Sequence, residues 1–290
     1  MINLEHITKS FGDNTVLRDI SLTIDKGEIF GLIGKNGAGK TTLLSILAGL
    51  ADATSGSCII NGHTISKKVR LNKIGYLPDV PAFFDFMTVD EFLDFLYRKE
   101  ADYKQKKESL LKLVGLNGKT VIKTMSRGMR QRLGMAATLV NDPDVILLDE
   151  PSSALDPMGR YELSQILLQL KQEGKTIILS THILTDMEEI CDRVGFLHNG
   201  TIVRTLSPQS AGASQKVRIS FLNPIDPAVA AGLAPEVSCE DDHSIILSGE
   251  LQTAEAQKAL LKKLLELDNP IAAINTIHAD LDEIFREVCL

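Results

Sequence analysis

A glycine-rich segment at 34–41, with the sequence GKNGAGKT, has the residue types and spacing of a phosphate-binding loop. An apolar run at 28–33 leads into it and helical apolar spacing follows it, which is the strand–loop–helix context that such a loop requires. The glycines let backbone N–H groups turn toward one anion, and the positive end of the helix adds to the attraction. Lys40 can reach the β- and γ-phosphates, and the Thr41 hydroxyl can ligate Mg²⁺. The segment therefore predicts a site for a nucleoside triphosphate.

The residues of this segment that we expect to bind the nucleotide are continuous in the sequence, because a loop of this kind wraps successive phosphate groups. They are Gly34, Lys35, Asn36, Gly37, Ala38, Gly39, Lys40, Thr41 and Thr42. Lys40 is also expected to act in catalysis, since its charge can stabilise the phosphates during the reaction.

Two adjacent carboxylates end a second apolar run, VILLDE at 145–150. The carboxyl ends of strands are where ligands bind in open α/β sheets. Asp149 is expected to hold Mg²⁺ through its water shell, because Mg²⁺ prefers few carboxylates and retained waters. Side chains alternate along a strand, so Glu150 points elsewhere and can align an attacking water as a general base. An acidic strand end that only faces solvent is the alternative.

A second candidate anion site lies in the segment MSRGMRQR at 125–132. Ser126 is a good helix N-cap, and Gly128 leaves its backbone N–H exposed. A hydroxyl together with the amides of a helix N-terminus can bind an anion. Simple helix capping explains the same residues, so the segment alone leaves both interpretations open.

A histidine follows the end of a third apolar run at 176–180. A single histidine is more often structural than functional. His182, however, is expected at the carboxyl end of a strand beside the phosphate loop, where it can probe the γ-phosphate.

The apolar pattern predicts an α/β fold for residues 1–208. Runs at 28–33, 145–149 and 176–180 are continuous, which is typical of a parallel sheet buried on both faces. A separate antiparallel β layer is expected from segments 2–9, 16–24 and 57–61. Helical spacing predicts a helical insertion at about 83–141, with helices at 89–96, 108–114 and 127–140.

A second, smaller α+β domain is expected at 215–290, after a small polar linker at 210–214. Its predicted order is β-α-β-β-α-β followed by a short helix, which suggests a split βαβ domain of the ferredoxin-like type. The predicted strands are at 217–221, 236–240, 244–247 and 271–277, and the predicted helices are at 227–233, 253–267 and 280–288.

Net charge, cysteine spacing and the pattern of apolar residues indicate the cellular compartment that we expect for this protein. The 290 residues carry a net charge of −7, which argues against nucleic-acid binding as the main activity. The four cysteines have no CxxC or histidine spacing, so we expect reduced thiols in a cytosolic protein rather than disulfides or a zinc site. Glu5 and Lys9 interrupt any apolar core of a signal peptide, and no segment approaches the ~20 apolar residues of a membrane helix. If a membrane is involved, another polypeptide must supply it.

Taken together, these motifs resemble those of the ATP-binding-cassette (ABC) ATPases over about Ile2 to Thr205. The loop at 34–41 matches the family's Walker A motif, and the run at 145–150 matches Walker B with Glu150 as the catalytic glutamate. The segment at 126–129 stands where the family signature reads SGGQ. The D-loop and the switch histidine of the family are matched by 153–156 and His182.

This resemblance implies a set of roles. Phe11 would stack on adenine and Val16 would pad the same ring. Ser126 and Gly128 would meet the γ-phosphate of an opposite subunit, and Asp156 would belong to the nucleotide site through the D-loop. The expected catalytic groups are Glu150, His182 and Lys40, and the expected Mg²⁺ ligands are Thr41, Asp79 and Asp149.

The sequence departs from the family pattern at two places. Asp79 replaces the usual glutamine, whose amide oxygen ligates Mg²⁺ and whose loop contacts the membrane partner. A carboxylate is a stronger ligand for Mg²⁺, but its reach is roughly 1.5 Å shorter. Arg127 and Met129 depart from the signature, while Ser126 and Gly128 are intact. We interpret both departures as subfamily variation.

The resemblance further implies two partners. One is a second copy of this chain, or a related subunit, in a head-to-tail dimer that sandwiches ATP, because Ser126 is expected to lie too far from its own γ-phosphate. The other is a separate integral membrane permease, which would hold the protein at the inner face of the cell membrane. The tail at 281–285 and the form of the signature are similar to those of bacterial exporter subunits for drugs, antimicrobial peptides or sodium.

Two alternatives to a transport subunit share these motifs. One is a soluble ABC ATPase in assembly or regulation, which the sequence does not distinguish from a transport subunit. The other is a structural protein of the chromosome-maintenance kind, which needs a long coiled coil between the Walker motifs. The chain has only ~100 residues there, without sustained heptads.

Overall fold

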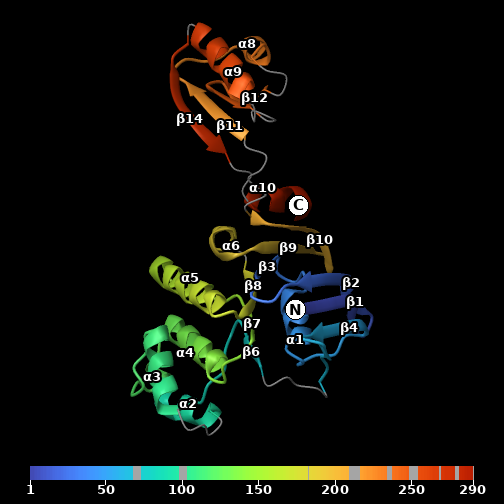
Figure 1. Ribbon diagram of the computed structural model, residues 1–290, viewed down its shortest axis with the longest axis vertical. Coiled ribbons are helices and arrows are strands. Elements are labelled where there is room, and N and C mark those ends of the chain that lie inside the picture. Colours follow the sequence, from blue (N-terminus) through green and yellow to red (C-terminus); the bar gives the residue numbers. More distant parts are fainter. Residues whose placement is uncertain are drawn as a thin grey trace. The chain divides into compact units, whose positions relative to one another are not determined.

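The central sheet of the computed structural model has the strand order β10-β9-β3-β8-β7-β6 (Figure 1). Its parallel strands are β3 (Ile29–Ile33), β6 (Ile74–Leu77), β7 (Val145–Asp149), β8 (Thr176–Thr181) and β9 (Arg193–His198). The edge strand β10 (Thr201–Leu206) runs antiparallel to β9. Every residue of β3, β7 and β8 is buried, which confirms the parallel core expected from the continuous apolar runs.

The structure describes residues 1–67, 73–97, 103–181, 183–208, 216–233, 237–247, 254–267, 269–277 and 281–289. They form two units, Met1–Ser207 with Val288–Leu290, and Pro208–Glu287. The predicted linker at 210–214, together with the predicted element starts at 236, 253 and 280, lies outside the described residues.

The first unit also contains an antiparallel sheet with the order β2-β1-β4-β5. Its strands are β1 (Ile2–Phe11), β2 (Asn14–Ile24), β4 (Ser55–Ile60) and β5 (His63–Thr64). The helix α1 (Lys40–Leu47) follows β3, and its buried leucines share one hydrophobic core with side chains from both sheets. The start of α1 is thereby held at the carboxyl end of the central sheet.

A helical insertion separates β6 from β7 in the sequence. It consists of α2 (Val89–Leu96), α3 (Tyr103–Val114), a 3₁₀ turn (Ile122–Thr124) and α4 (Arg127–Leu139). Thr88 and Glu91 form a capping box at the start of α2. The helix predicted at 108–114 begins earlier, at Tyr103, because its first turn is too polar to show the apolar spacing.

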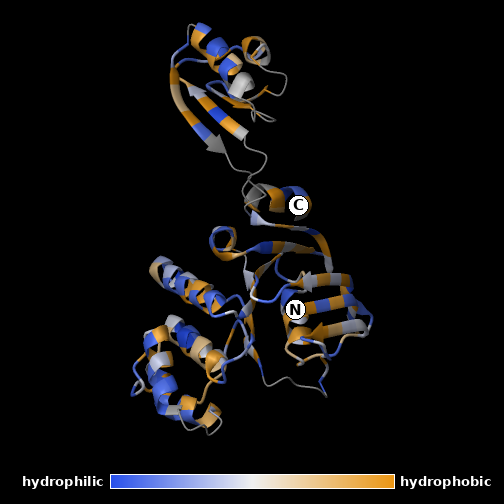
Figure 2. Cartoon of the chain, in the orientation of Figure 1, coloured by the Kyte–Doolittle hydropathy of each residue, from blue (hydrophilic) through white to orange (hydrophobic). Residues whose placement is uncertain are grey.

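The described part of the first unit also contains the helices α5 (Pro157–Gln172), between β7 and β8, and α6 (Leu184–Ile190), between β8 and β9. In Figure 2, α4 and α5 carry both hydrophobic and hydrophilic residues, as helices do that cover a core with one face. Among the described residues, no helix has the length and hydrophobicity that crossing a bilayer would require.

The second unit has an antiparallel sheet with the order β12-β13-β11-β14. Its elements follow one another as β11 (Lys216–Phe221), α8 (Pro227–Ala231), β12 (Val237–Asp241), β13 (Ser244–Leu247), α9 (Ala254–Glu266) and β14 (Ile271–Ile277). A separate core joins the sheet to α9 through Ile219, Ile245 and Leu264. The described chain ends with α10 (Leu281–Cys289).

The three free thiols that the structure describes differ in reactivity. Cys58 and Cys191 are buried, and Cys239 is exposed. Burial raises the pKa of Cys58 to about 12 and also raises that of Cys191. We expect a maleimide at about pH 8 to label Cys239 in the native protein and to leave the two buried thiols unlabelled until the chain unfolds, because the thiolate is the nucleophile. Peptide mapping by mass spectrometry measures this; labelling of Cys58 as fast as Cys239 would contradict it.

Candidate nucleotide-binding site

Glycine is required by geometry at two positions of the loop between β3 and α1. Gly39, the residue before α1, has φ +112°, a conformation that other residues rarely adopt. A Cβ atom there would lie 2.6 Å from Leu17 Cδ2, and one at Gly34 would lie 2.5 Å from the carbonyl oxygen of Leu197. The loop therefore approaches β2 and β9 as closely as a bare backbone allows.

Lys40 is the first residue of α1, and its side chain is only 6% exposed. Its Nζ donates to the carbonyl oxygens of Gly34 at 2.6 Å and Lys35 at 3.4 Å. The same nitrogen lies 3.4 Å from Glu150 Oε1. The ammonium is thus held between the loop's own carbonyls and a carboxylate from the end of β7, so the structure brings these two predicted catalytic groups together.

Asp149, the last residue of β7, is 1% exposed. Its Oδ1 accepts a hydrogen bond from Ser180 Oγ at 2.6 Å, whereas its Oδ2 has no hydrogen-bond partner among the described residues. A buried carboxylate oxygen without a partner is costly unless something else binds it. Mg²⁺ prefers such oxygen donors, supplemented by substrate phosphates and water. Asp149 and the Thr41 hydroxyl in the first turn of α1 therefore fit a magnesium ion.

Among the described residues, no group of three or more His, Cys, Asp or Glu side chains could hold a metal ion. A magnesium ion here would have to share its shell with phosphate oxygens and water, which is its usual mode in nucleotide sites.

Glu150 adopts a left-handed backbone conformation, with φ +49°. Its N–H donates to the carbonyl oxygen and to the Oγ of Ser180, both at 3.1 Å. Non-glycine residues persist in this conformation only where their surroundings impose it. The turn directs the chain out of β7, so that the Glu150 carboxylate meets Lys40 instead of continuing the strand.

Of the two residues expected at adenine, Val16 lies beside the loop and Phe11 ends β1. The ring of Phe11 is 56% exposed, with Lys9 Nζ 4.8 Å from its centroid. Val16 is half-buried, and its carbonyl oxygen would lie 3.3 Å from a Cβ at Gly39. An exposed ring face at the end of β1 is available for stacking on a base.

Asp79 is exposed, just beyond the end of β6. Its Oδ1 accepts a hydrogen bond from Ser153 Oγ at 3.3 Å. Burial and then the charge of Asp149 raise the pKa of Tyr76, and the charge of Asp79 adds to this effect. Both carboxylates therefore act on the same tyrosine, which shows that the ends of β6 and β7 converge.

The predicted signature and D-loop residues lie at helix starts. Ser126 caps α4, its Oγ accepting from the N–H of Met129 at 3.2 Å. Asp156 caps α5, its Oδ1 accepting from the N–H of Gly159 at 2.9 Å. A Cβ at Gly128 would lie 3.4 Å from the carbonyl oxygen of Ala154, so the first turn of α4 lies on the segment that precedes α5.

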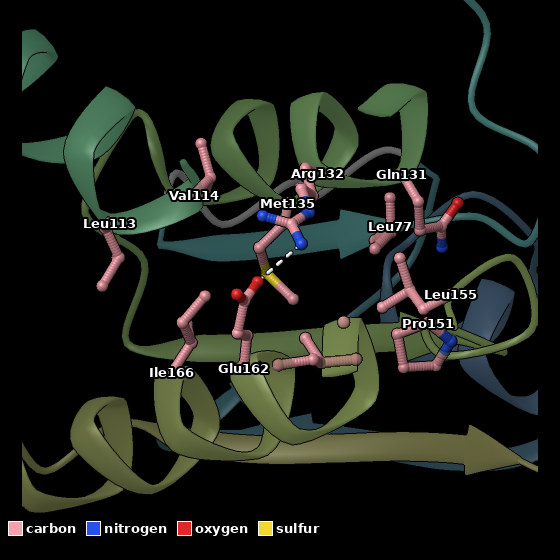
Figure 3. Close-up of a pocket in the computed structure, with 12 residues that line it drawn as sticks. Leu77, Leu113, Val114, Gln131, Arg132, Met135, Pro151, Leu155, Glu162 and Ile166 are labelled. Atoms are coloured by element: carbon pink, nitrogen blue, oxygen red, sulfur yellow. Dashed lines mark hydrogen bonds and ion pairs between the residues drawn. The ribbon is translucent and has the colours of Figure 1, made fainter. Parts of the chain in front are cut away.

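A small cavity of about 30 Å³ separates the helical insertion from α5. Figure 3 shows Arg132 of α4 and Glu162 of α5 pointing toward each other across it, with Nη2 and Oε2 2.5 Å apart. Its other walls are mainly apolar, including Leu77, Met135 and Leu155. The helical insertion therefore contacts α5 through the ion pair between Arg132 and Glu162 and through apolar side chains that leave a small cavity between them.

His182 and Ser180 differ from the other site residues in what was predicted and what the structure describes. His182 lies outside the described residues, so its predicted role stays a prediction. Ser180 was missed by the sequence reasoning, although its position at the end of a predicted parallel strand was a usable signal. The register of β7 on β8 pairs Asp149 with Ser180, and this pairing brings the hydroxyl to the carboxylate.

Comparisons with known proteins identify the family to which this chain is similar. A family model described as "ABC transporter" matches residues 17–153. The chain is 45% identical over 195 residues to the uncharacterized ABC transporter ATP-binding protein sll0415 of Synechocystis; the match covers 64% of this chain but only 55% of that relative's length. It is 38% identical over 205 residues to the lantibiotic transport ATP-binding protein SrtF of Streptococcus pyogenes, covering 70% of this chain and 89% of SrtF.

A solved structure extends the similarity to the fold. The dimeric structure of the ATP-binding cassette MJ0796, in a post-hydrolysis state bound to ADP and phosphate, matches with a TM-score of 0.66 at 27% identity. The match covers 72% of this chain and 99% of that one.

Proposed function

Because this chain belongs to the ABC transporter family of ATP-binding proteins, we propose that it binds and hydrolyses MgATP as the ATPase subunit of a membrane exporter. The observation that carries the proposal is the placement of Lys40, Asp149 and Glu150 at one end of the central sheet. Lys40 Nζ lies 3.4 Å from Glu150 Oε1, and Asp149 Oδ2 has no hydrogen-bond partner among the described residues.

Each residue of the proposed site has a separate role in phosphoryl transfer. The loop amides and Lys40 bind the β- and γ-phosphates, and Phe11 with Val16 holds the adenine. Thr41, Asp149 and Asp79 would hold Mg²⁺, which neutralises charge on the phosphates. Glu150 accepts the proton of the attacking water, and His182 contacts the γ-phosphate.

The contact between Lys40 and Glu150 suggests how binding prepares catalysis. In the structure, the loop carbonyls and the Glu150 carboxylate balance the charge of the ammonium. Phosphate oxygens carry more negative charge and would replace Glu150 as partners of Lys40. The freed carboxylate then becomes available to orient water at the γ-phosphate.

A second copy would complete the site. Ser126 is exposed at the start of α4, where a hydroxyl and helix amides face solvent. In a head-to-tail dimer, Ser126 and Gly128 of each copy would cover the nucleotide of the other. The similarity to MJ0796, whose structure bound to ADP and phosphate is dimeric, supports the formation of a dimer.

An exposed aromatic patch offers a surface for the membrane subunit. It consists of Phe84, Phe86 and Phe95, which are 44–77% exposed. The Phe84 ring centroid lies 5.8 Å from that of Phe86 and 5.7 Å from that of Phe95. Exposed apolar patches of this kind mark interaction sites. Phe84 follows Asp79 closely in the sequence, so a helix of a separate permease that docked on this patch would be connected to the proposed metal site through a short loop.

The proposed cargo class is that of drug or antimicrobial-peptide exporters, supported by the similarity to the lantibiotic transport protein SrtF. The protein would then be cytoplasmic and bound to the inner face of the membrane through its permease. A soluble ABC ATPase in assembly or regulation is the second candidate, and it predicts no membrane partner.

Glu150→Gln tests the hydrolytic role. We expect the rate of phosphate release from ATP to fall at least about 100-fold while ATP binding stays within about threefold, because an amide cannot accept the proton of water. Glu173→Gln, at the end of α5, is the control and should change neither. A Glu150→Gln protein that hydrolyses ATP at nearly the wild-type rate contradicts the mechanism, and a wild-type protein without Mg²⁺-dependent ATPase activity contradicts the proposed function.

Phe86→Ser combined with Phe95→Ser tests the membrane partner. Wild-type protein purified from detergent extracts of its host should carry an integral membrane protein, and the double variant should lose it at least about tenfold, because the apolar contact is removed. ATP binding should not change. Leu265→Ser, a similarly exposed apolar residue on α9, is the control. Recovery of soluble partners alone would support the second candidate instead.

A further inference from the structure

Ser180 contacts the carboxylate of Asp149 and the backbone N–H of Glu150. It is fully buried in β8, and its register partner in β7 is Asp149. Its hydroxyl lies 2.6 Å from Asp149 Oδ1, and the same oxygen lies 3.1 Å from the backbone nitrogen of Glu150.

The Ser180 hydroxyl has a single proton, so it can donate a hydrogen bond to only one partner. Asp149 Oδ1, as part of a carboxylate, can only accept, so Ser180 must donate to it. Toward Glu150 the serine oxygen acts as an acceptor. The Glu150 N–H has a second acceptor in the Ser180 carbonyl at 3.1 Å. Removing the hydroxyl therefore deprives Asp149 of its donor, while the Glu150 N–H keeps a backbone partner.

Asp149 depends on this donor because it is almost inaccessible to water. With Oδ1 held by Ser180, the carboxylate is fixed about its Cβ–Cγ bond and Oδ2 stays available. Without the donor, both oxygens lack partners among the described residues, and a rotated carboxylate becomes as favourable as the present one. Hydrogen bonds to charged groups are the strong ones, so the loss of this bond is expected to be measurable.

We propose that Ser180 is a positioning residue for the metal: it holds Asp149 Oδ1 so that Oδ2 is presented to the shell of Mg²⁺. This inference rests on the proposed function, since it assumes that the site takes nucleotide with Mg²⁺. According to this proposal, the Ser180 hydroxyl affects the Mg²⁺ concentration that nucleotide binding requires by orienting Asp149, and not by contacting the metal or the nucleotide.

Ser180→Ala tests the proposal through binding rather than through turnover. Binding of a fluorescent ATP analogue is titrated with MgCl₂, and binding with excess EDTA gives the metal-free baseline. We expect the Mg²⁺ concentration for half-maximal enhancement to rise about tenfold, because one hydrogen bond to a carboxylate is lost. Metal-free binding should stay unchanged. Ser180→Thr, which keeps the hydroxyl, should return the Mg²⁺ requirement to within about threefold of the wild type.

Thr176→Val provides a matched control on the same strand. Thr176 is also buried, and its Oγ1 accepts from the N–H of Gly27 at 3.0 Å, at the other end of β8. Its substitution should leave the Mg²⁺ requirement unchanged even if it lowers the melting temperature. Should Ser180→Ala fail to fold, Ser180→Cys keeps nearly the same volume with a weaker donor, and it should raise the Mg²⁺ requirement as well.

Two results would overturn the inference. If folded Ser180→Ala or Ser180→Cys needs the same Mg²⁺ as the wild type while Asp149→Asn needs much more, then Ser180 does not position Asp149. If the wild type shows no Mg²⁺-dependent nucleotide binding, then the proposed function fails and the inference fails with it.

Discussion

The first unit depends on the burial of one positive charge, the ammonium of Lys40. A buried charge is strongly unfavourable unless it is paired and hydrogen-bonded. Here the loop carbonyls and Glu150 provide partners, and they do so only because β3 and β7 end at the same edge of the sheet. The left-handed turn at Glu150 and the close approach of Gly39 to Leu17 both follow from this convergence. A triphosphate would satisfy the same charge better, which supports the proposed nucleotide site.

The parts of the fold that could be predicted from sequence are those whose physical cause is local. The phosphate loop, the apolar strand before Asp149 and the Ser126 cap each depend on a few adjacent residues, and the parallel core follows from continuous apolar runs. The contacts of Ser180 and Asp156 could not be anticipated in the same way. Ser180 meets Asp149 through a strand register that joins residues 31 apart. Asp156 forms a helix cap that we did not predict, and its expected place in the nucleotide site stays a prediction.

The helical insertion carries the residues with which the proposed second copy would complete the site. Its helix α4 begins with Ser126 in solvent and contacts the segment before α5 at Gly128, while Arg132 bridges to Glu162. These contacts connect the candidate anion site of α4 to the loop that leaves β7. A nucleotide bound across two copies would therefore act on both the signature helix and the Walker B strand, and the aromatic patch would transmit the change to a membrane partner.

Activity of mixed variants tests the central claim, that two copies share each nucleotide site. Lys40→Ala disables the phosphate loop of the chain that carries it. Ser126→Ala disables the anion site with which a chain would cover the nucleotide of the other copy. Each variant alone should therefore be nearly inactive. In a mixed dimer that contains one chain of each variant, one nucleotide site has both substitutions. The other nucleotide site has neither substitution and is intact. An equal mixture should recover about a quarter of the wild-type ATPase rate if the dimer is isologous and the sites are independent. A mixture no more active than the separate variants, or full activity of Ser126→Ala alone, would contradict the shared site.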